Sequence, residues 1–231
     1  PLPLTSGFST IRTNFGQVKN SGFDFSFSSR NIDKEWTWDT DIVFSVLKNE
    51  VVELPTFAAE VISGEFGFSG NYLITKVGSP IMSFYGYEQN GIFQTSDNIS
   101  ASAQPSALPG HPKFVDQNND KIIDGKDRVV LGDPFADMTF GFTNRIGYKD
   151  FTLEVYIQGV QGIETFSNLA AESLYPINKE RNHFAVHYLD RWTTSNTNAA
   201  YPSGVNYTSY SDGANKVNSY TVQDASFMRI K

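Results

Sequence analysis

Side-chain oxygens recur at a regular spacing in one twelve-residue stretch, DQNNDKIIDGKD, which begins at Asp116 and ends at Asp127. EF-hand loops take their calcium ligands from positions 1, 3, 5, 7, 9 and 12, and position 7 contributes its backbone carbonyl. Oxygen ligands at this density favour calcium over zinc. The stretch therefore predicts a structural calcium site, whose ligands are Asp116, Asn118, Asp120, the carbonyl of Ile122, Asp124 and Asp127.

Two positions of this stretch depart from the EF-hand pattern. The glycine that makes the sharp turn at position 6 is replaced by Lys121, and the last ligand is Asp127 where glutamate is usual. The alternative is an acidic, solvated loop of Asx turns that holds no metal. No nucleophile or base stands beside these carboxylates in the sequence, so we expect the loop to have a structural role.

A second pair of metal-ligand side chains is found in HFAVH, which places His183 and His187 four residues apart. On a helix over residues 179–190 the two imidazoles could bind zinc, but the adjacent glutamate of a zinc protease is missing. Phe184, Tyr188 and Trp192 form their own row at the same spacing, which favours an amphipathic helix in an outer loop.

The aromatic residues that follow could either stack on sugar rings or pack on one another. They are Trp192, Tyr201, Tyr207 and Tyr210. Neither a glycine-rich phosphate loop nor a Ser/His/Asp spacing occurs in the sequence. We therefore predict that the chain is not an enzyme.

Composition points to a mainly β protein that does not bind nucleic acid. The 231 residues include 19 Phe and 11 Tyr, and only 19% are charged. Aromatic residues favour strands, whereas the residues that fill helices are scarce. The net charge of −7 opposes binding to a phosphate backbone, and the absence of cysteine excludes disulfides.

Apolar and polar residues alternate in four segments, which are residues 21–30, 35–46, 139–148 and 151–158. In the first, Phe23, Phe25 and Phe27 share one face, and in the second Trp36 and Trp38 do so. Such alternation is typical of a soluble β-sandwich and of a transmembrane β-barrel alike. Segment lengths favour the barrel, because very short turns at residues 31–34 and 149–150 alternate with long segments at 48–81, 96–138 and 161–218.

The polar face of these strands would line the interior of such a barrel, because charge on the lipid face is costly. The residues predicted to lie there are Asp24, Ser26, Arg30, Glu35, Asp39, Asp41, Arg145, Glu154 and Gln158. Between the long strands, SFYGYEQNGIFQT predicts a short hairpin that turns at Asn90 and Gly91.

Several blocks, in their order, resemble one family. They are GQVKNSGFDFSFSSRNIDKEWTWDTDIVFSVLKNEVVEL, SFYGYEQNGIFQT, DQNNDKIIDGKDRVVLGDPFADMTFGFTNRIGYKDFTLEVYIQG, YLDRWTTSNTNAAYPS and VQDASFMRIK. Together they look like the later barrel region of the SusC/RagA family of TonB-linked outer-membrane proteins of Bacteroidetes. The resemblance implies a barrel of about 22 strands, an N-terminal plug, a SusD-like surface lipoprotein as partner, and TonB-driven import of oligosaccharides or peptides.

The fold expected is thus all-β, an antiparallel transmembrane β-barrel segment with long extracellular loops. Residues 1–231 would form part of the barrel domain in the outer-membrane lipid, without the plug, the TonB-contacting region or the final strands. Such a piece would not transport alone, because an open sheet leaves backbone groups unpaired in lipid. The alternative function is a secreted, calcium-stabilised β-sandwich that binds carbohydrate.

Overall fold

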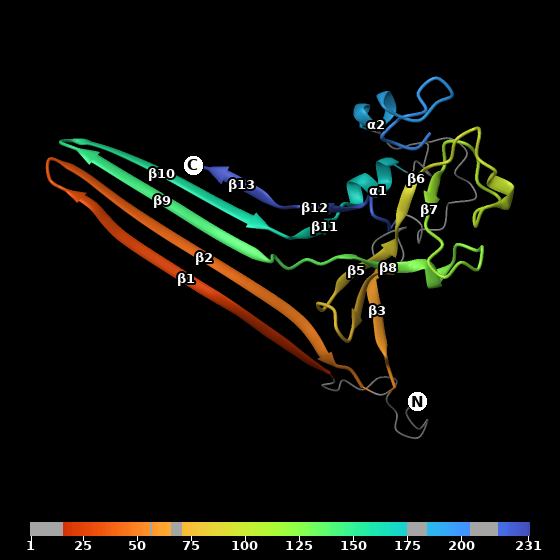
Figure 1. Cartoon of the computed structure of the whole chain (residues 1–231), viewed down its shortest axis with the longest axis horizontal. Coiled ribbons are helices and arrows are strands. Elements are labelled where there is room, and N and C mark those ends of the chain that lie inside the picture. Colours follow the sequence, from red (N-terminus) through yellow and green to blue (C-terminus); the bar gives the residue numbers. More distant parts are fainter. Residues whose placement is uncertain (1–15, 56, 66–70, 175–183, 204–216) are drawn as a thin grey trace, which may run out of the picture.

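The computed structural model describes residues 16–55, 57–65, 71–174, 184–203 and 217–231. Its elements are mainly antiparallel strands, which form one long sheet and a group of small sheets gathered at one end of it (Figure 1). In this described part of the chain, no helix is both long and apolar enough to cross a membrane.

The long sheet has five antiparallel strands in the order β1-β2-β9-β10-β13. Their bounds are β1 Gln17–Asp33, β2 Trp36–Glu53, β9 Met138–Tyr148, β10 Phe151–Gln161 and β13 Phe227–Ile230. Two-residue turns at 34–35 and 149–150 join β1 to β2 and β9 to β10, and both turns lie at the end away from the small sheets (Figure 1). The predicted asymmetry between short turns and long connections is confirmed.

Residues 54–137, which connect β2 to β9, fold into the small sheets. One sheet has the order β3-β4-β5-β8 and another pairs β6 with β7, while β11 and β12 pair after β10. The bounds are β3 Glu60–Glu65, β4 Asn71–Lys76, β5 Ser83–Tyr87, β6 Gln89–Ile92, β7 Pro112–Phe114, β8 Arg128–Gly132, β11 Glu164–Phe166 and β12 Val222–Asp224. The helices are α1 Asn168–Leu174, α2 Ala185–Leu189 and the 3₁₀ turns Ile99–Ala101 and Gly125–Asp127.

The hairpin predicted at Asn90 and Gly91 is wrong. β5 pairs with β4 and β8, whereas β6 pairs with β7. These pairings bring Tyr87, Phe93 and Phe114 into one buried core, together with Ala107 and Ala170. Burial of several large side chains outweighs the local preference of an Asn-Gly turn.

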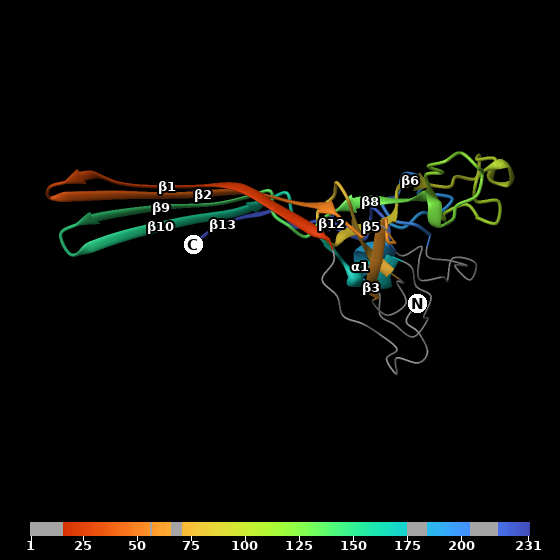
Figure 2. The ribbon, with the colours of Figure 1, turned by 90° about the horizontal axis from the view of Figure 1, so that it is seen from below.

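The long sheet is a single layer, as its edge-on view shows (Figure 2). Large apolar side chains on one face remain accessible, with exposed fractions of 61% for Phe23, 46% for Phe25 and 53% for Trp36. A β-sandwich would bury such a face against a second sheet. No second sheet covers it within the described residues.

Candidate functional site

The apolar face of the long sheet ends in a pair of stacked rings beside the short turns. Trp36 on β2 lies in register with Tyr148 on β9, and their ring centroids are 4.3 Å apart. The ammonium group of Lys149 lies 5.0 Å from the centroid of the Tyr148 ring. Aromatic rings at the end of an apolar strand face are typical of the boundary between hydrocarbon and lipid headgroups.

On the opposite face, four charged side chains of alternating sign form one row across four strands. Arg30 Nε lies 2.9 Å from Asp39 Oδ1, and Arg145 Nη2 lies 2.8 Å from Glu154 Oε2. Asp39 and Arg145 are register partners between β2 and β9, which joins the two ion pairs. The sequence predicted that these residues share a face, and the register arranges them as a charged row.

The other residues predicted on this face are also placed by the register. Asp24 accepts a hydrogen bond of 2.5 Å from the Ser45 hydroxyl, and Gln158 accepts one of 3.2 Å from Lys231. Ser26 lies opposite Val43, and Asp41 opposite Ser28. Glu35 differs, because it lies in the turn between β1 and β2 and is exposed there.

A polar network interrupts the apolar face, and the sequence analysis missed it. Ser29 donates to Asn31 at 3.0 Å, and the Asn31 amide donates to Thr40 at 2.8 Å. Thr40 and the Trp38 indole both donate to Asn144 Oδ1, each at 2.9 Å. The signal was present in the sequence, because Thr40 and Asn144 each break an apolar row, but only the register shows that they meet.

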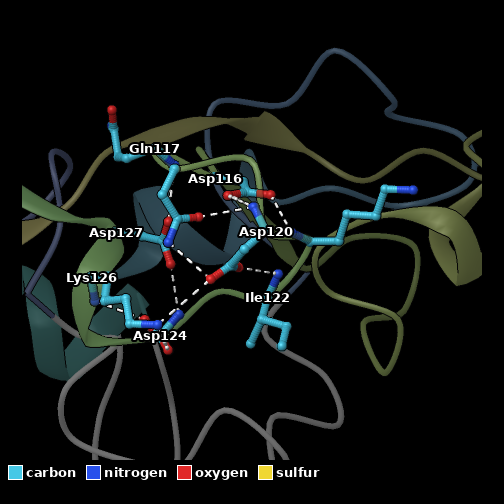
Figure 3. Close-up of polar contacts among 9 residues, drawn as sticks. Asp116, Gln117, Asp120, Ile122, Asp124, Lys126 and Asp127 are labelled. Atoms are coloured by element: carbon cyan, nitrogen blue, oxygen red, sulfur yellow. Dashed lines mark hydrogen bonds and ion pairs between the residues drawn. The ribbon is translucent and has the colours of Figure 1, made fainter.

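The first half of the acidic loop is a series of turns closed by its own side chains (Figure 3). Asp116 accepts hydrogen bonds from the backbone N–H groups of Asp120, at 3.2 Å, and Lys121, at 2.8 Å. Asn118 Oδ1 accepts from the N–H of Asp120 at 2.9 Å, and Asp120 accepts from that of Ile122 at 3.0 Å.

The second half of the loop is fixed by a reciprocal cap on the 3₁₀ turn Gly125–Asp127. Asp124 accepts from the Lys126 N–H at 2.8 Å, and Asp127 accepts from the Asp124 N–H at 2.7 Å. The buried Asp127 also accepts from the Gln117 N–H at 2.9 Å, which ties the end of the loop to its start. Lys126 Nζ lies 3.9 Å from Asp120 and 4.0 Å from Asp124.

At position 6 of the loop, a lysine takes the place of the glycine of an EF-hand. Lys121 has a φ of 67°, the left-handed conformation that glycine usually provides at position 6. No group of three or more Asp, Glu, His or Cys side chains in the described ranges is gathered closely enough to hold a metal ion. The carboxylate oxygens instead accept backbone N–H groups, and each keeps a further lone pair. The calcium site therefore stays a prediction.

The predicted helix over residues 179–190 is shorter in the structure, where α2 covers Ala185–Leu189. His183 lies outside the described residues, so the proposed histidine pair is untested. The His187 ring packs against Phe184 and Tyr201, with ring centroids 5.5 and 4.5 Å apart.

Trp192, one of the aromatic residues considered for sugar stacking, is buried and donates a hydrogen bond of 2.9 Å to Gln94, so it packs inside the protein. Tyr207 and Tyr210 also lie outside the described residues.

Arg128, which follows the acidic loop directly, anchors β8 to its neighbours. Its guanidinium group donates to the backbone carbonyls of Asn71 and Tyr85, the latter at 2.5 Å, and lies 4.4 Å from the centroid of the Tyr85 ring. Burial lowers the pKa of Arg128. The loop and the sheet β3-β4-β5-β8 are therefore joined at one residue.

Comparison with known proteins identifies relatives along the whole chain, although no protein-family model matches it. A TonB-dependent receptor of Formosa agariphila, P3, is 31% identical over 239 aligned residues, which cover 100% of this chain and 23% of the receptor. A second receptor of the same organism is 32% identical with the same coverage. The chain is related to the TonB-dependent receptors. SusC of Bacteroides thetaiotaomicron is 28% identical over 160 residues, which cover 65% of this chain and 15% of SusC.

Solved structures of a peptide transporter share the fold. The match to the RagAB peptide transporter covers 100% of this chain and 24% of the transporter chain. Its TM-score is 0.74, and the two sequences are 19% identical. The open-open state of the RagAB peptide importer matches with a TM-score of 0.71 at 20% identity. The resemblance to the SusC/RagA family is thereby confirmed, and so is the antiparallel barrel-segment fold. The chain spans about 23% of the length of the curated relatives it matches.

Proposed function

We propose that this chain forms part of the wall and outer loops of an outer-membrane, TonB-dependent importer. The observation that carries the proposal is the single-layer sheet, with one apolar and one polar face, in a chain that aligns throughout with TonB-dependent receptors. In the wall of such a barrel, the apolar face of the sheet contacts lipid, and the charged row faces the barrel interior. Residues 1–231 then belong to the barrel domain, and no residue of the chain has a catalytic role.

The proposed partners and substrate class are supported by the same relationship. A SusD-like lipoprotein would close over the end that carries the small sheets, and TonB would act through a part of the receptor outside this chain. RagAB is a peptide transporter, whereas the sequence analysis allowed both oligosaccharides and peptides. We propose import of one of these two classes.

Calcium is proposed as a structural ion of the outer loop. Its ligands would be Asp116, Asn118, Asp120, the Ile122 carbonyl, Asp124 and Asp127. An extracellular site of modest affinity, with a dissociation constant of about 10⁻⁴–10⁻³ M, would fill at the calcium concentrations found outside cells. Two features support this proposal: Lys121 has the left-handed conformation usual at position 6 of an EF-hand loop, and the hydrogen bond from Gln117 to Asp127 brings the two ends of the loop together.

Cell fractionation of the full-length protein tests the proposed location. We expect the protein in the outer-membrane fraction, resistant to extraction by salt and released by detergent. A soluble periplasmic marker and a known outer-membrane protein serve as controls. Recovery in the periplasm or in the medium would contradict the proposal.

A further inference from the structure

The apolar face of the long sheet ends in charged side chains at the end nearest the small sheets. On β2, Lys48 and Glu50 continue the row of alternate residues that begins at Trp36 and includes Val46. On β1, Lys19 is the register partner of Glu50, so its side chain lies on the same face. Two lysines and one carboxylate therefore follow the apolar residues on this face.

These three side chains leave a net positive charge that solvent can reach. Lys48 Nζ lies 3.2 Å from Glu50 Oε2, and the Lys48 side chain is 73% exposed. An ammonium group has three N–H donors, so one ion pair leaves others available. Lys19 is exposed and forms no ion pair with another residue in the described part of the chain. One carboxylate thus stands between two lysines.

The depth of the lysines follows from the length of β2. The Trp36–Tyr148 pair marks the headgroup boundary beside the short turns. With a rise of about 3.3 Å per residue and a strand tilt of about 45°, Val46 lies about 23 Å from that boundary along the membrane normal, and Lys48 about 28 Å. The apolar band of an outer-membrane barrel is about 25 Å tall. Its outer limit therefore falls between these two residues, and Lys48 lies just beyond the hydrocarbon.

We propose that Lys48 and Lys19 bind a phosphate group of a lipid in the outer leaflet, whose acyl chains lie along the apolar face below them. The inference rests on the proposed function, because it takes the apolar face as the lipid-facing side of a barrel wall. Lysine is a common ligand of phosphate, and long basic side chains can place their charge at the headgroup level. The continuity of the lysines with the apolar face favours a phosphate that carries acyl chains over free phosphate.

The contact can be tested with two lipids that differ only in phosphate. The full-length receptor, purified in a non-ionic detergent, is titrated with phosphorylated lipid A and with the same lipid after removal of its phosphates, and bound lipid is counted by native mass spectrometry. We expect the wild type to bind the phosphorylated lipid at least about fivefold more tightly, and Lys48→Gln and Lys19→Gln each to weaken that binding by about fivefold. Lys48→Arg keeps the charge and should keep the preference.

Lys34→Gln is the matched control, because it removes the same charge from an exposed turn at the opposite end of the sheet. It should leave binding of both lipids unchanged. Equal binding of the two lipids by the wild type would overturn the proposal, as would equal losses in Lys34→Gln and Lys48→Gln. Displacement of the lipid by inorganic phosphate at the same concentration would assign the lysines to free phosphate and would also contradict the lipid contact.

Membrane fractionation of each variant separates this inference from the function on which it rests. A receptor absent from the outer membrane would contradict the proposed function. A receptor present there that binds both lipids equally would contradict the lipid contact alone.

Discussion

Lys121 shows how single residues of the acidic loop hold its shape. A non-glycine residue in the left-handed region costs about 1–2 kcal/mol, and φ at Lys121 is 67°. The 2.8 Å hydrogen bond from its N–H to Asp116 helps to offset that cost. The turn therefore depends on carboxylates that accept backbone N–H groups, and those carboxylates also repel one another.

Calcium should relieve this repulsion and protect the loop. At about 1 mM calcium we expect cleavage within residues 96–138 to slow by up to about tenfold, given a dissociation constant of about 10⁻⁴ M. Asp120→Ala should remove most of the protection. Limited proteolysis of the full-length protein, with calcium and with a chelator, measures the effect. Four equal cleavage rates for the two proteins under the two conditions would show that the loop does not bind calcium.

Asp133, between β8 and β9, should make local stability depend on pH. Burial and the nearby charge of Asp137 raise its pKa, although the hydrogen bond from the Phe135 N–H acts in the opposite direction. A carboxyl with a raised folded-state pKa binds its proton more tightly when folded. Its contribution to stability is therefore favourable at low pH and is lost as the pH rises through the raised value.

Asp133→Asn keeps the acceptor for Phe135 but cannot ionise, so this part of the pH dependence should disappear. Hydrogen exchange over residues 128–137, corrected for the intrinsic rate and compared between acidic and neutral pH, gives the opening free energy. We expect the variant to be the more stable protein at neutral pH. An identical pH dependence in both proteins would mean that Asp133 ionises freely.

Residue spacing alone predicted an acidic loop at residues 116–127, because most of its hydrogen bonds join residues two to five positions apart, and only the bond from Gln117 to Asp127 spans the whole loop. It did not predict the polar network, in which Thr40 and Asn144 are joined across two strands far apart in the sequence. It also missed Arg128, whose partners on β4 and β5 are set by the sheet order. Contacts of this kind need the register, which the sequence of one strand does not contain.

The long strands were predicted where apolar and polar residues alternate clearly. The strand ends were missed where this alternation is lost. β1 extends from Gln17 to Asp33, well beyond the predicted residues 21–30, because pairing with β2 continues through mixed polar residues. The hairpin at Asn90 failed for the opposite reason. A strong local turn signal was overridden by burial of Phe93 in a core that local reasoning could not identify.

Strand faces can be checked by cysteine labelling in intact membranes. Phe25 and Ser26 are neighbours on β1 whose side chains lie on opposite faces. We expect a cysteine at Ser26 to react at least about tenfold faster with a water-soluble maleimide than one at Phe25, because water is excluded from the hydrocarbon region. A cysteine at Lys34, in the turn, provides the accessible reference. Faster labelling at Phe25 would reverse the assignment of the two faces.

At the scale of the whole molecule, the long sheet has open edges. β1 pairs with β2 alone and β13 with β10 alone among the described strands. The unpaired backbone groups of β1 would promote association in detergent. We expect residues 1–231 expressed alone to elute as large, heterogeneous assemblies in size-exclusion chromatography, and the full-length receptor to elute as a discrete species. A monodisperse monomer of the isolated chain would show that the edges are closed in another way.

The direct pairing of β2 with β9 across residues 54–137 affects how such a protein can diversify. The entropy lost on closing a flexible connection grows only with the logarithm of its length, so a connection half as long again costs about 0.4 kcal/mol more. The small sheets also bury their own core around Tyr87 and Phe114. The connecting segments can therefore be exchanged or enlarged while the strand register stays constant, so that loops of different chemistry can be carried by one sheet.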